Sequence, residues 1–184
     1  LLGEPRRWHP LVGFGNYVQR LELVFNKNPH SKYAYLWGFF TWSIAVLPVV
    51  YVAYWLQQQG QLWQWGVDVG LLYFALGARS LGQHAEAVRQ PLEAGDLATA
   101  RTKVGWMVSR DTTQLDASGV SKAAMESVLE NGNDAIFGTL FWFFVWGAPG
   151  ALLFRFANTL DAMWGYRTPR FSYFGWMAAR FDDV

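Results

Sequence analysis

The stretch that most constrains the fold is LWGFFTWSIAVLPVVYVAYWL, residues 36–56, which contains no Asp, Glu, Lys, Arg or His. At about 1.5 Å of rise per residue, a helix of this length spans roughly 30 Å, the hydrocarbon thickness of a bilayer. Pro48 lies inside the stretch, and proline is tolerated in membrane helices. Tyr51, Tyr54 and Trp55 near its end resemble an interfacial aromatic belt. We therefore predict a membrane-spanning helix here rather than the buried core helix of a soluble protein.

Two further apolar stretches follow along the chain. Residues 66–78 carry one charge, Asp68, and come after an uncharged, glutamine-rich turn. Residues 135–154 carry no charge, but the sequence GAPG at 147–150 interrupts them. These patterns predict a helical hairpin from the first two stretches and a broken or re-entrant pair of helices in the third. The predicted fold class is all-α: a polytopic helical membrane protein with a single membrane-embedded domain over residues 1–184.

Basic residues flank the predicted hairpin on both outer sides and are absent from its turn. They are Arg6, Arg7, Arg20, Lys27 and Lys32 before it, and Arg79, Arg89, Arg101 and Lys103 after it. The positive-inside rule places both flanks in the cytoplasm. Residues 79–134 hold six Lys or Arg and eight Asp or Glu, and we expect Pro91 and Gly95 to divide them into helices, with Asp96 as an N-cap. The expected architecture is a soluble helical insert on the cytoplasmic side of the inner membrane.

The net charge and the cysteine count exclude several classes of function. A net charge of +1 gives little support to nucleic-acid binding. The absence of cysteine excludes disulfides, thiolate metal sites and a cysteine nucleophile. The motifs GxxxxGK[ST], GxGxxG, HExxH and GxSxG are also absent. We expect membrane lipids and no nucleic acid among the partners, and because the chain opens on LLGEPRRWHP and stops at ARFDDV, we expect it to be a fragment.

Three acidic residues, Glu126, Glu130 and Asp134, stand four residues apart in ESVLENGNDA, directly before the third apolar stretch. On one α-helix they share a face, and each like-charge pair costs about 0.2–0.5 kcal/mol. A compensating positive charge is therefore expected. It is either a ladder of salt bridges that includes Lys122, or a divalent cation such as Mg²⁺ held by a few carboxylates and substrate phosphates. Asn131 adds an uncharged oxygen ligand or a phosphate donor in the same segment.

A second group of polar residues follows the third apolar stretch. Asn158 and Asp161 are three residues apart on a predicted helix. Arg167 and Arg170 follow in a proline-containing loop, where their guanidinium groups suit a phosphate because the fork matches phosphate oxygens in pairs. The alternative for these arginines is anchoring at the membrane surface. Neither reading is favoured by the residues alone.

Arg110 and Thr112 lie in the loop before the acidic helix. A guanidinium and a hydroxyl there are placed to reach the same ligand. Helix capping is the alternative for Thr112, since Ser and Thr hydroxyls often bond the backbone locally.

As a set, these motifs resemble adenosylcobinamide-phosphate synthase of cobalamin biosynthesis. The segments that carry the resemblance are, in order, LLGEPRRWHPLVGFG, LEAGDLATAR, VGWMVSRDT, ESVLENGNDA and NTLDAMWGYRTPRFSYFGWMAARFDDV. The resemblance covers nearly the whole chain. It implies an integral membrane protein with a further hydrophobic helix before this chain and further apolar segments after it. It also implies ATP-dependent amide ligation, in which a propionate of adenosylcobyric acid joins the amine of 1-aminopropan-2-ol phosphate.

This resemblance implies ATP and Mg²⁺ as cofactors and roles for the polar residues. Glu126, Glu130 and Asp134 are expected to bind Mg²⁺ and to deprotonate the amine. The expected substrate- and phosphate-binding residues are Arg110, Thr112, Asn131, Asn158, Asp161, Tyr166, Arg167 and Arg170. Tryptophans at 106, 142, 164 and 176 are candidates for packing on the corrin ring, with core or interfacial packing as the alternative.

Two other classes of protein compete with the enzyme. A non-catalytic membrane signalling protein, such as the regulators of β-lactamase induction, has no reason to keep the stacked acids and the loop arginines together. A small transporter subunit is expected to place charges within its spans, and here the spans carry only Asp68. The enzyme is therefore the favoured interpretation.

Overall fold

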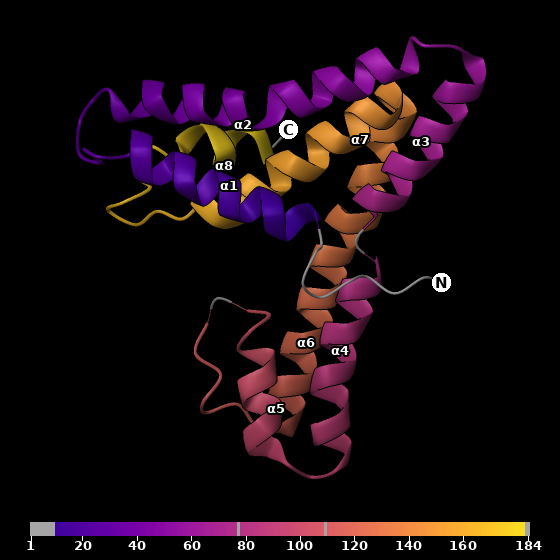
Figure 1. The fold of residues 1–184 in the computed structure, drawn as a ribbon. Helices are drawn as coiled ribbons and strands as arrows, with labels where there is room; N and C mark the ends of the chain where they lie inside the picture. Colours follow the sequence, from indigo (N-terminus) through magenta and orange to yellow (C-terminus); the bar gives the residue numbers. More distant parts are fainter. Residues whose placement is uncertain (1–9, 77, 109, 183–184) are drawn as a thin grey trace.

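The computed structural model describes residues 10–76, 78–108 and 110–182, and every regular element in these ranges is a helix (Figure 1). The predicted all-α fold class is confirmed. The helices form two parts. The first, the apolar bundle, consists of α1 (Pro10–Phe25), α2 (Ala34–Gln57), α3 (Gln61–Ala75), α7 (Thr139–Trp164) and α8 (Trp176–Asp182). The second, the helical arm, consists of α4 (Ala78–Glu93), α5 (Leu97–Val104) and α6 (Ala117–Gly132) and projects from the bundle. The basic residues Arg6 and Arg7 lie outside the described residues.

Helix α2 matches the first predicted span to within two residues at either end. Its 24 residues are long and apolar enough to cross a membrane. One side packs into the core of the bundle through Trp42 and Val46, while Phe39 and Tyr51 are exposed on other sides. Because soluble proteins rarely leave so many large apolar side chains in water, α2 indicates a membrane protein.

The second predicted span, residues 66–78, lies mostly in α3, which begins at Gln61 and ends at Ala75 and is too short to cross a bilayer. Its 15 residues correspond to about 22 Å, less than the roughly 30 Å of bilayer hydrocarbon. Within the part of the chain that the structure describes, only Ala34–Gln57 and Ala117–Trp164 have the length and hydropathy of candidate spans. The predicted hairpin is present, since α3 packs against both α2 and α7, but α3 itself lacks the length of a spanning helix. The polytopic topology therefore stays a prediction.

The third apolar stretch is broken, as predicted. Helix α6, the π-helix η1 (Asn133–Gly138) and α7 follow one another without a gap, but Trp146 and Gly147 leave the helical conformation, and Gly147 has a φ of +67°. A side chain at this φ would be strained, which explains why glycine occupies the break. After it, α7 turns back beneath α2 toward α8 (Figure 1). Whether this turn returns the chain to the same side of a membrane stays a prediction.

Asp68, the charged residue of the second predicted span, stabilises the break in α7 through hydrogen bonds. Its Oδ1 accepts a hydrogen bond from the backbone N–H of Ala148 at 3.1 Å and a second one from the side chain of Gln57. Ala148 begins the second half of α7, so the carboxylate acts as an N-cap where the helix dipole also favours a negative charge. The lone charge of the hairpin thus has a structural role.

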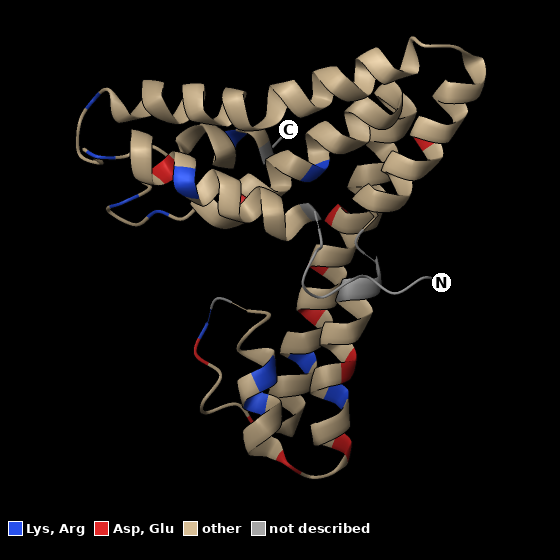
Figure 2. Ribbon diagram, in the orientation of Figure 1, with Lys and Arg blue, Asp and Glu red and all other residues tan. Residues whose placement is uncertain are grey.

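The helical arm corresponds to the predicted insert, residues 79–134, and has a small core of its own. The buried members of this core are Val88, Ala100, Val104, Val120 and Ala123. Figure 2 shows that charged residues gather on the arm and in loops at one end of the bundle, whereas α2 carries none. The cytoplasmic location of the arm stays a prediction.

The junction between α4 and α5 confirms one predicted signal and corrects another. Asp96 is the N-cap of α5 and accepts a hydrogen bond from the backbone N–H of Thr99 at 3.0 Å. Pro91 does not divide the helices, because α4 continues through it to Glu93. Gly95 ends the helix instead: its φ is +77°, and the next residue donates its backbone N–H to the Pro91 carbonyl, which is the bonding pattern of a glycine C-cap.

Candidate functional site

A pocket of about 600 Å³ lies where the helical arm meets the apolar bundle. Its walls come from α6, η1, the second half of α7 and the segment after α5. We call it the acidic pocket. The predicted site residues that line it are Arg110, Glu126, Glu130, Asn131, Asp134, Asn158, Asp161 and Tyr166. Residues from two distant segments of the sequence therefore meet in one cavity, as the predicted site requires.

Glu126, the first of the three stacked acids, is balanced by two cations. Its Oε2 lies 2.7 Å from Nη2 of Arg110, and its Oε1 lies 3.9 Å from Nζ of Lys122. These pairs are exposed to solvent, so they contribute at most about 1 kcal/mol. The predicted salt-bridge ladder is thus present at this end of the acidic row.

The third acid, Asp134, lies in the π-helix η1 rather than in an α-helix. The hydroxyl of Thr139 donates to the carbonyl of Asp134 at 3.3 Å, five residues back along the chain. Asp134 still lines the same pocket as Glu126 and Glu130. π-Helical turns are rare in proteins, and many of those known lie at functional sites.

The acidic row does not form a preassembled metal cage. Among the described residues, no group of three or more His, Asp or Glu side chains is arranged to hold a metal ion. Mg²⁺ is usually bound by one or two carboxylates together with water and substrate phosphates. The carboxylates of the acidic pocket therefore suit a cation shared with a phosphorylated substrate better than one held by the protein alone.

Asn131 belongs to a hydrogen-bond network that joins α6 to the segment after α5 at the wall of this pocket. Its Nδ2 donates to the carbonyl and the hydroxyl of Ser127 at 2.8 and 3.1 Å, and the Ser127 hydroxyl donates to the Met107 carbonyl at 2.9 Å. Because both amide hydrogens have acceptors, Oδ1 is the atom of Asn131 that can serve a ligand. Asn131 is thus placed to accept a hydrogen bond or bind a cation, rather than to donate to phosphate.

Thr112, a predicted site residue, does not line the acidic pocket. Its side chain is buried, and its hydroxyl donates to the carbonyl of Arg101 at 3.0 Å. Arg101 in turn donates from Nε to the carbonyl of Leu115 at 2.6 Å. These bonds tie the loop to α5, so the structure favours the alternative that Thr112 bonds the backbone.

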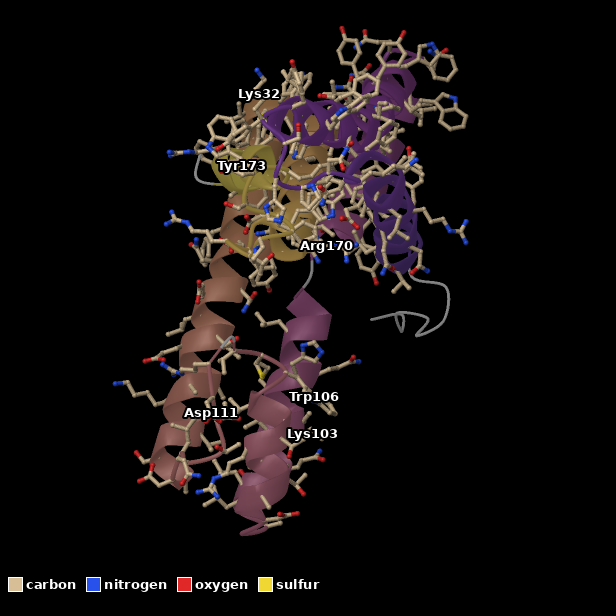
Figure 3. All side chains as sticks on the ribbon, turned by 90° about the vertical axis from the view of Figure 1, so that its left-hand side faces the viewer. Lys32, Lys103, Trp106, Asp111, Arg170 and Tyr173 are labelled. Carbon is tan, nitrogen blue, oxygen red and sulfur yellow. The ribbon has the colours of Figure 1, made fainter. Side chains whose placement is uncertain are left out.

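Arg170 also lies away from the acidic pocket, because it is paired with Glu22 of α1. Its Nε and Nη2 donate to the two carboxylate oxygens of Glu22 at 2.9 and 2.5 Å. The Glu22 side chain is 4% exposed, and its hydrogen bonds raise the pKa of Arg170 above the ordinary value. Asn26 reinforces the pair by donating to Glu22 and to the Arg170 carbonyl. Figure 3 places Arg170 in the bundle, apart from Trp106 and Asp111 in the arm.

Arg167 is exposed and lines a separate cavity of about 280 Å³ between the loop after α7 and α8, together with Arg180. Tyr166 lines both this cavity and the acidic pocket. Arg167 and Arg170 therefore do not meet at one phosphate in this structure. Arg170 pairs with Glu22, whereas Arg167 lines the cavity beside α8.

The tryptophans proposed to pack on a corrin ring divide into two groups. Trp164 is 1% exposed and packs edge-on against Phe174, so it belongs to the core of the bundle and cannot contact a ligand. Trp106 is 72% exposed, and Nζ of Lys103 lies 4.1 Å from its ring centre (Figure 3). Trp176 is also exposed. Trp106 is the better placed of these, because it lines a second cavity whose walls share Asn131, Asp134 and Asn158 with the acidic pocket.

Comparisons with known proteins agree with the resemblance found in the sequence. Residues 1–184 match the family described as CobD/Cbib protein. The cobalamin biosynthesis proteins CobD of Chromobacterium violaceum and of Stutzerimonas stutzeri are each 54% identical to the chain, and CbiB of Salmonella typhimurium is 35% identical. Each match covers all of this chain and 60% of the relative. The chain thus spans about three fifths of the length of these relatives. No solved structure matches it.

Proposed function

Because the chain belongs to the CobD/CbiB protein family, we propose that it acts in cobalamin biosynthesis as an ATP-dependent, amide-forming ligase. The substrates are adenosylcobyric acid, which supplies a propionate carboxylate, and 1-aminopropan-2-ol phosphate, which supplies the amine. The product is adenosylcobinamide phosphate. The names of the relatives support the pathway, and the chemistry of the acidic pocket supports the reaction type.

The observation that carries the proposal is the meeting of Glu126, Glu130 and Asp134 with Asn158 and Asp161 in one pocket. Amide formation from a protonated amine needs a base within hydrogen-bond reach of the nitrogen. A row of carboxylates attracts the ammonium group and then accepts its proton. Like charges at this spacing repel one another. Arg110 and Lys122 balance Glu126, and a cationic ligand would offset the repulsion that Glu130 and Asp134 add.

The reaction balances with ATP as the activating substrate. A carboxylate oxygen of the corrinoid acid attacks the γ-phosphorus of ATP, which gives an acyl phosphate and ADP. The amine nitrogen then attacks the acyl carbon, and inorganic phosphate leaves as the amide forms. The proton lost by the ammonium group passes to a carboxylate of the pocket. Mg²⁺ bound with the nucleotide supplies charge neutralisation on the phosphates.

The residues divide these tasks according to their surroundings. Arg110 already forms an ion pair with Glu126, so this carboxylate contributes to the field that draws in the ammonium group but is not the base. We assign the base to Glu130, which lies exposed in the pocket one turn further along α6. Asn158 and Asp161 on α7 orient the substrate from the opposite wall. These assignments leave Thr112 and Arg170 as structural residues.

The test is ATP-dependent formation of adenosylcobinamide phosphate by the full-length protein in detergent, with and without Mg²⁺. Glu130→Gln is expected to lower kcat by about 100-fold or more, the usual contribution of a general base. Glu93→Gln, which changes an exposed glutamate at the far end of the arm, is the matched control and should retain activity. Undiminished activity in Glu130→Gln would contradict the assigned base. No product from the folded protein would contradict the function and favour the signalling protein.

We further propose that the protein is a multi-pass protein of the inner membrane with the acidic pocket facing the cytoplasm. The exposed aromatic surface of α2 and the charged surface of the arm support this orientation. The chain has no cysteine, so Thr168→Cys introduces a single labelling site into this chain, in the loop after α7. Labelling by an impermeant reagent is expected only from the cytoplasmic face. Labelling only from the periplasm would overturn the topology.

A further inference from the structure

A second cavity, of about 280 Å³, adjoins the acidic pocket. The two cavities share Ser127, Asn131, Asp134 and Asn158 among their lining residues, so they lie on either side of one polar wall. The residues that belong to the second cavity and not to the first include His84 of α4 and Arg155 of α7. Neither was predicted as a site residue from the sequence. We call this space the basic cavity.

The two cavities differ in charge. Among the described residues that line it, the acidic pocket has the carboxylates of Glu126, Glu130, Asp134 and Asp161 and the guanidinium of Arg110. The basic cavity has Arg155 and the imidazole of His84 against the shared Asp134. A ligand that spans the wall therefore meets negative groups at one end and a cation at the other.

The position of Arg155 also distinguishes it from a surface arginine. It is half-buried in the second half of α7, next to the buried residues Phe156 and Ala157. Arginine is rarely buried even in part without a charged or polar partner. Asn158 follows three residues later, on the same face of the helix, and borders both cavities. One face of α7 thus carries the guanidinium of Arg155 at the basic cavity and the amide of Asn158 at the wall that both cavities share.

We propose that the basic cavity is the phosphate subsite for the amine substrate. An aminoalkyl phosphate then lies across the polar wall, with its phosphate at Arg155 and His84 and its ammonium group at the carboxylates of the acidic pocket. A guanidinium pairs with two phosphate oxygens at once, and the imidazole supplies a further hydrogen-bond donor. The inference rests on the proposed function, which makes such a compound one of the substrates. It adds the residues that recognise the phosphate group of that substrate, Arg155 and His84.

The test compares the binding of 1-aminopropan-2-ol phosphate and of 1-aminopropan-2-ol to the full-length protein in detergent by titration calorimetry. Arg155→Gln is expected to weaken binding of the phosphorylated amine by about 10- to 100-fold, the range for losing a charged hydrogen bond. Binding of the free amino alcohol should change less than about 2-fold. Arg155→Lys keeps the charge but loses the fork, so it should give an intermediate loss. His84→Gln should give a smaller loss with the same selectivity.

Arg20→Gln is the matched control, because it removes an exposed arginine of α1 and should leave both affinities unchanged. An equal loss of affinity for both amines in Arg155→Gln would show a structural role and overturn the inference. If Arg155→Gln weakens the binding of ATP alone, the cavity belongs to the nucleotide, and the inference is overturned as well. If Arg155→Gln does not fold, Arg155→Lys and His84→Gln decide the question by the same comparison.

The calorimetry separates this inference from the proposed function. If Arg155→Gln selectively loses affinity for the phosphorylated amine but the wild-type protein forms no amide, the subsite is supported and the ligase function is contradicted. If Arg155→Gln forms the amide with an unchanged KM for the phosphorylated amine, the subsite is contradicted and the ligase function is supported.

Discussion

The apolar bundle and the helical arm both enclose a core, but their surfaces differ. The bundle buries side chains such as Trp42 and Leu160, yet it also leaves Leu62, Trp63 and Phe144 exposed. The arm buries a handful of small aliphatic residues and covers them with ion pairs such as those that Arg89 forms with Glu86 and Glu93. The arm therefore has the polar surface of a protein in water, whereas the apolar surface of the bundle suits a lipid environment.

This difference explains why the candidate site lies at the junction of the two parts. The arm can carry a row of carboxylates because its surface is solvated, and the broken helix of the bundle brings Asn158 and Asp161 against that row. The proposed ligase, which would join a large corrinoid to a small charged amine at a membrane surface, requires both environments. The following predictions test the contrast between them, starting with the largest expected effect.

The same substitution should have opposite outcomes in the two parts. Leu47→Lys places a charge near the middle of α2 on an exposed position, and Leu129→Lys does so on α6, where the leucine is 74% exposed against 50% for Leu47. In a bilayer the first change costs about 3 kcal/mol, whereas an exposed substitution in water usually changes stability by less than about 0.5 kcal/mol. We expect Leu47→Lys to prevent accumulation in the membrane fraction and Leu129→Lys to accumulate normally.

Immunoblots of membrane fractions measure this effect, with Leu47→Ala as the control for the loss of the leucine alone. Equal accumulation of the two lysine variants would show that α2 does not face lipid.

Truncating a buried side chain in one core should destabilise that core and leave the other core unchanged. Val46→Ala in the bundle and Val104→Ala in the arm each truncate a fully buried valine, at a cost of about 2 kcal/mol. Because the two clusters are separate, Val104→Ala should speed hydrogen exchange in α4, α5 and α6, and Val46→Ala should speed it in α2 and α7. Faster exchange throughout the chain in either variant would mean that the two parts unfold as one unit.

The break in α7 should depend on the acceptor at Asp68 rather than on its charge. Asp68→Leu removes the acceptor for the Ala148 N–H and is expected to lower stability by about 1 kcal/mol, the usual effect of losing an N-cap. Asp68→Asn keeps a side-chain oxygen and should lose much less. Thermal unfolding in detergent distinguishes the two variants. An equal loss in both would indicate that the negative charge itself is required.

The smallest effect is expected from the surface ion pairs of the arm. Hydrogen bonds from Arg89 lower the pKa of Glu86 from its ordinary 4.5 to about 2. A lowered pKa in the folded state means that the stabilisation is complete above pH 4.5 and is lost as the pH falls toward 2. The protection factors of the amides in α4, which are corrected for the intrinsic pH dependence of exchange, should therefore fall over this range, less steeply in high salt. Glu86→Gln should remove this contribution, and an unchanged pH profile in that variant would assign it to another group.

Local signals in the sequence predicted much of this structure. The charge-free run gave α2 to within two residues, GAPG marked the break in α7, and Asp96 after Gly95 marked the start of α5. The four-residue spacing of the acids brought them to one pocket. Each of these features depends on contacts between near neighbours, which is why a single sequence contains the information.

Other features depend on contacts that no local pattern encodes. Arg170 was expected at a phosphate, but its partner Glu22 lies 148 residues away in the chain. The π-helix that contains Asp134 has no signature in the residues from 133 to 138. His84 and Arg155 become site candidates only when α4 and α7 are seen to border one cavity. In each case the tertiary packing, and not the local pattern, decides where the side chain lies.

The central claim is that the arm and the bundle supply one site, and a double-mutant cycle tests it most directly. The kcat/KM for amide formation is measured in Glu130→Gln on the arm, in Asn158→Ala on the bundle, and in the double variant. Residues that act on the same bound substrate give strongly non-additive effects. The double variant should therefore be little worse than the more damaging single variant. Losses that multiply would contradict a shared site, because they would mean that Glu130 and Asn158 act independently.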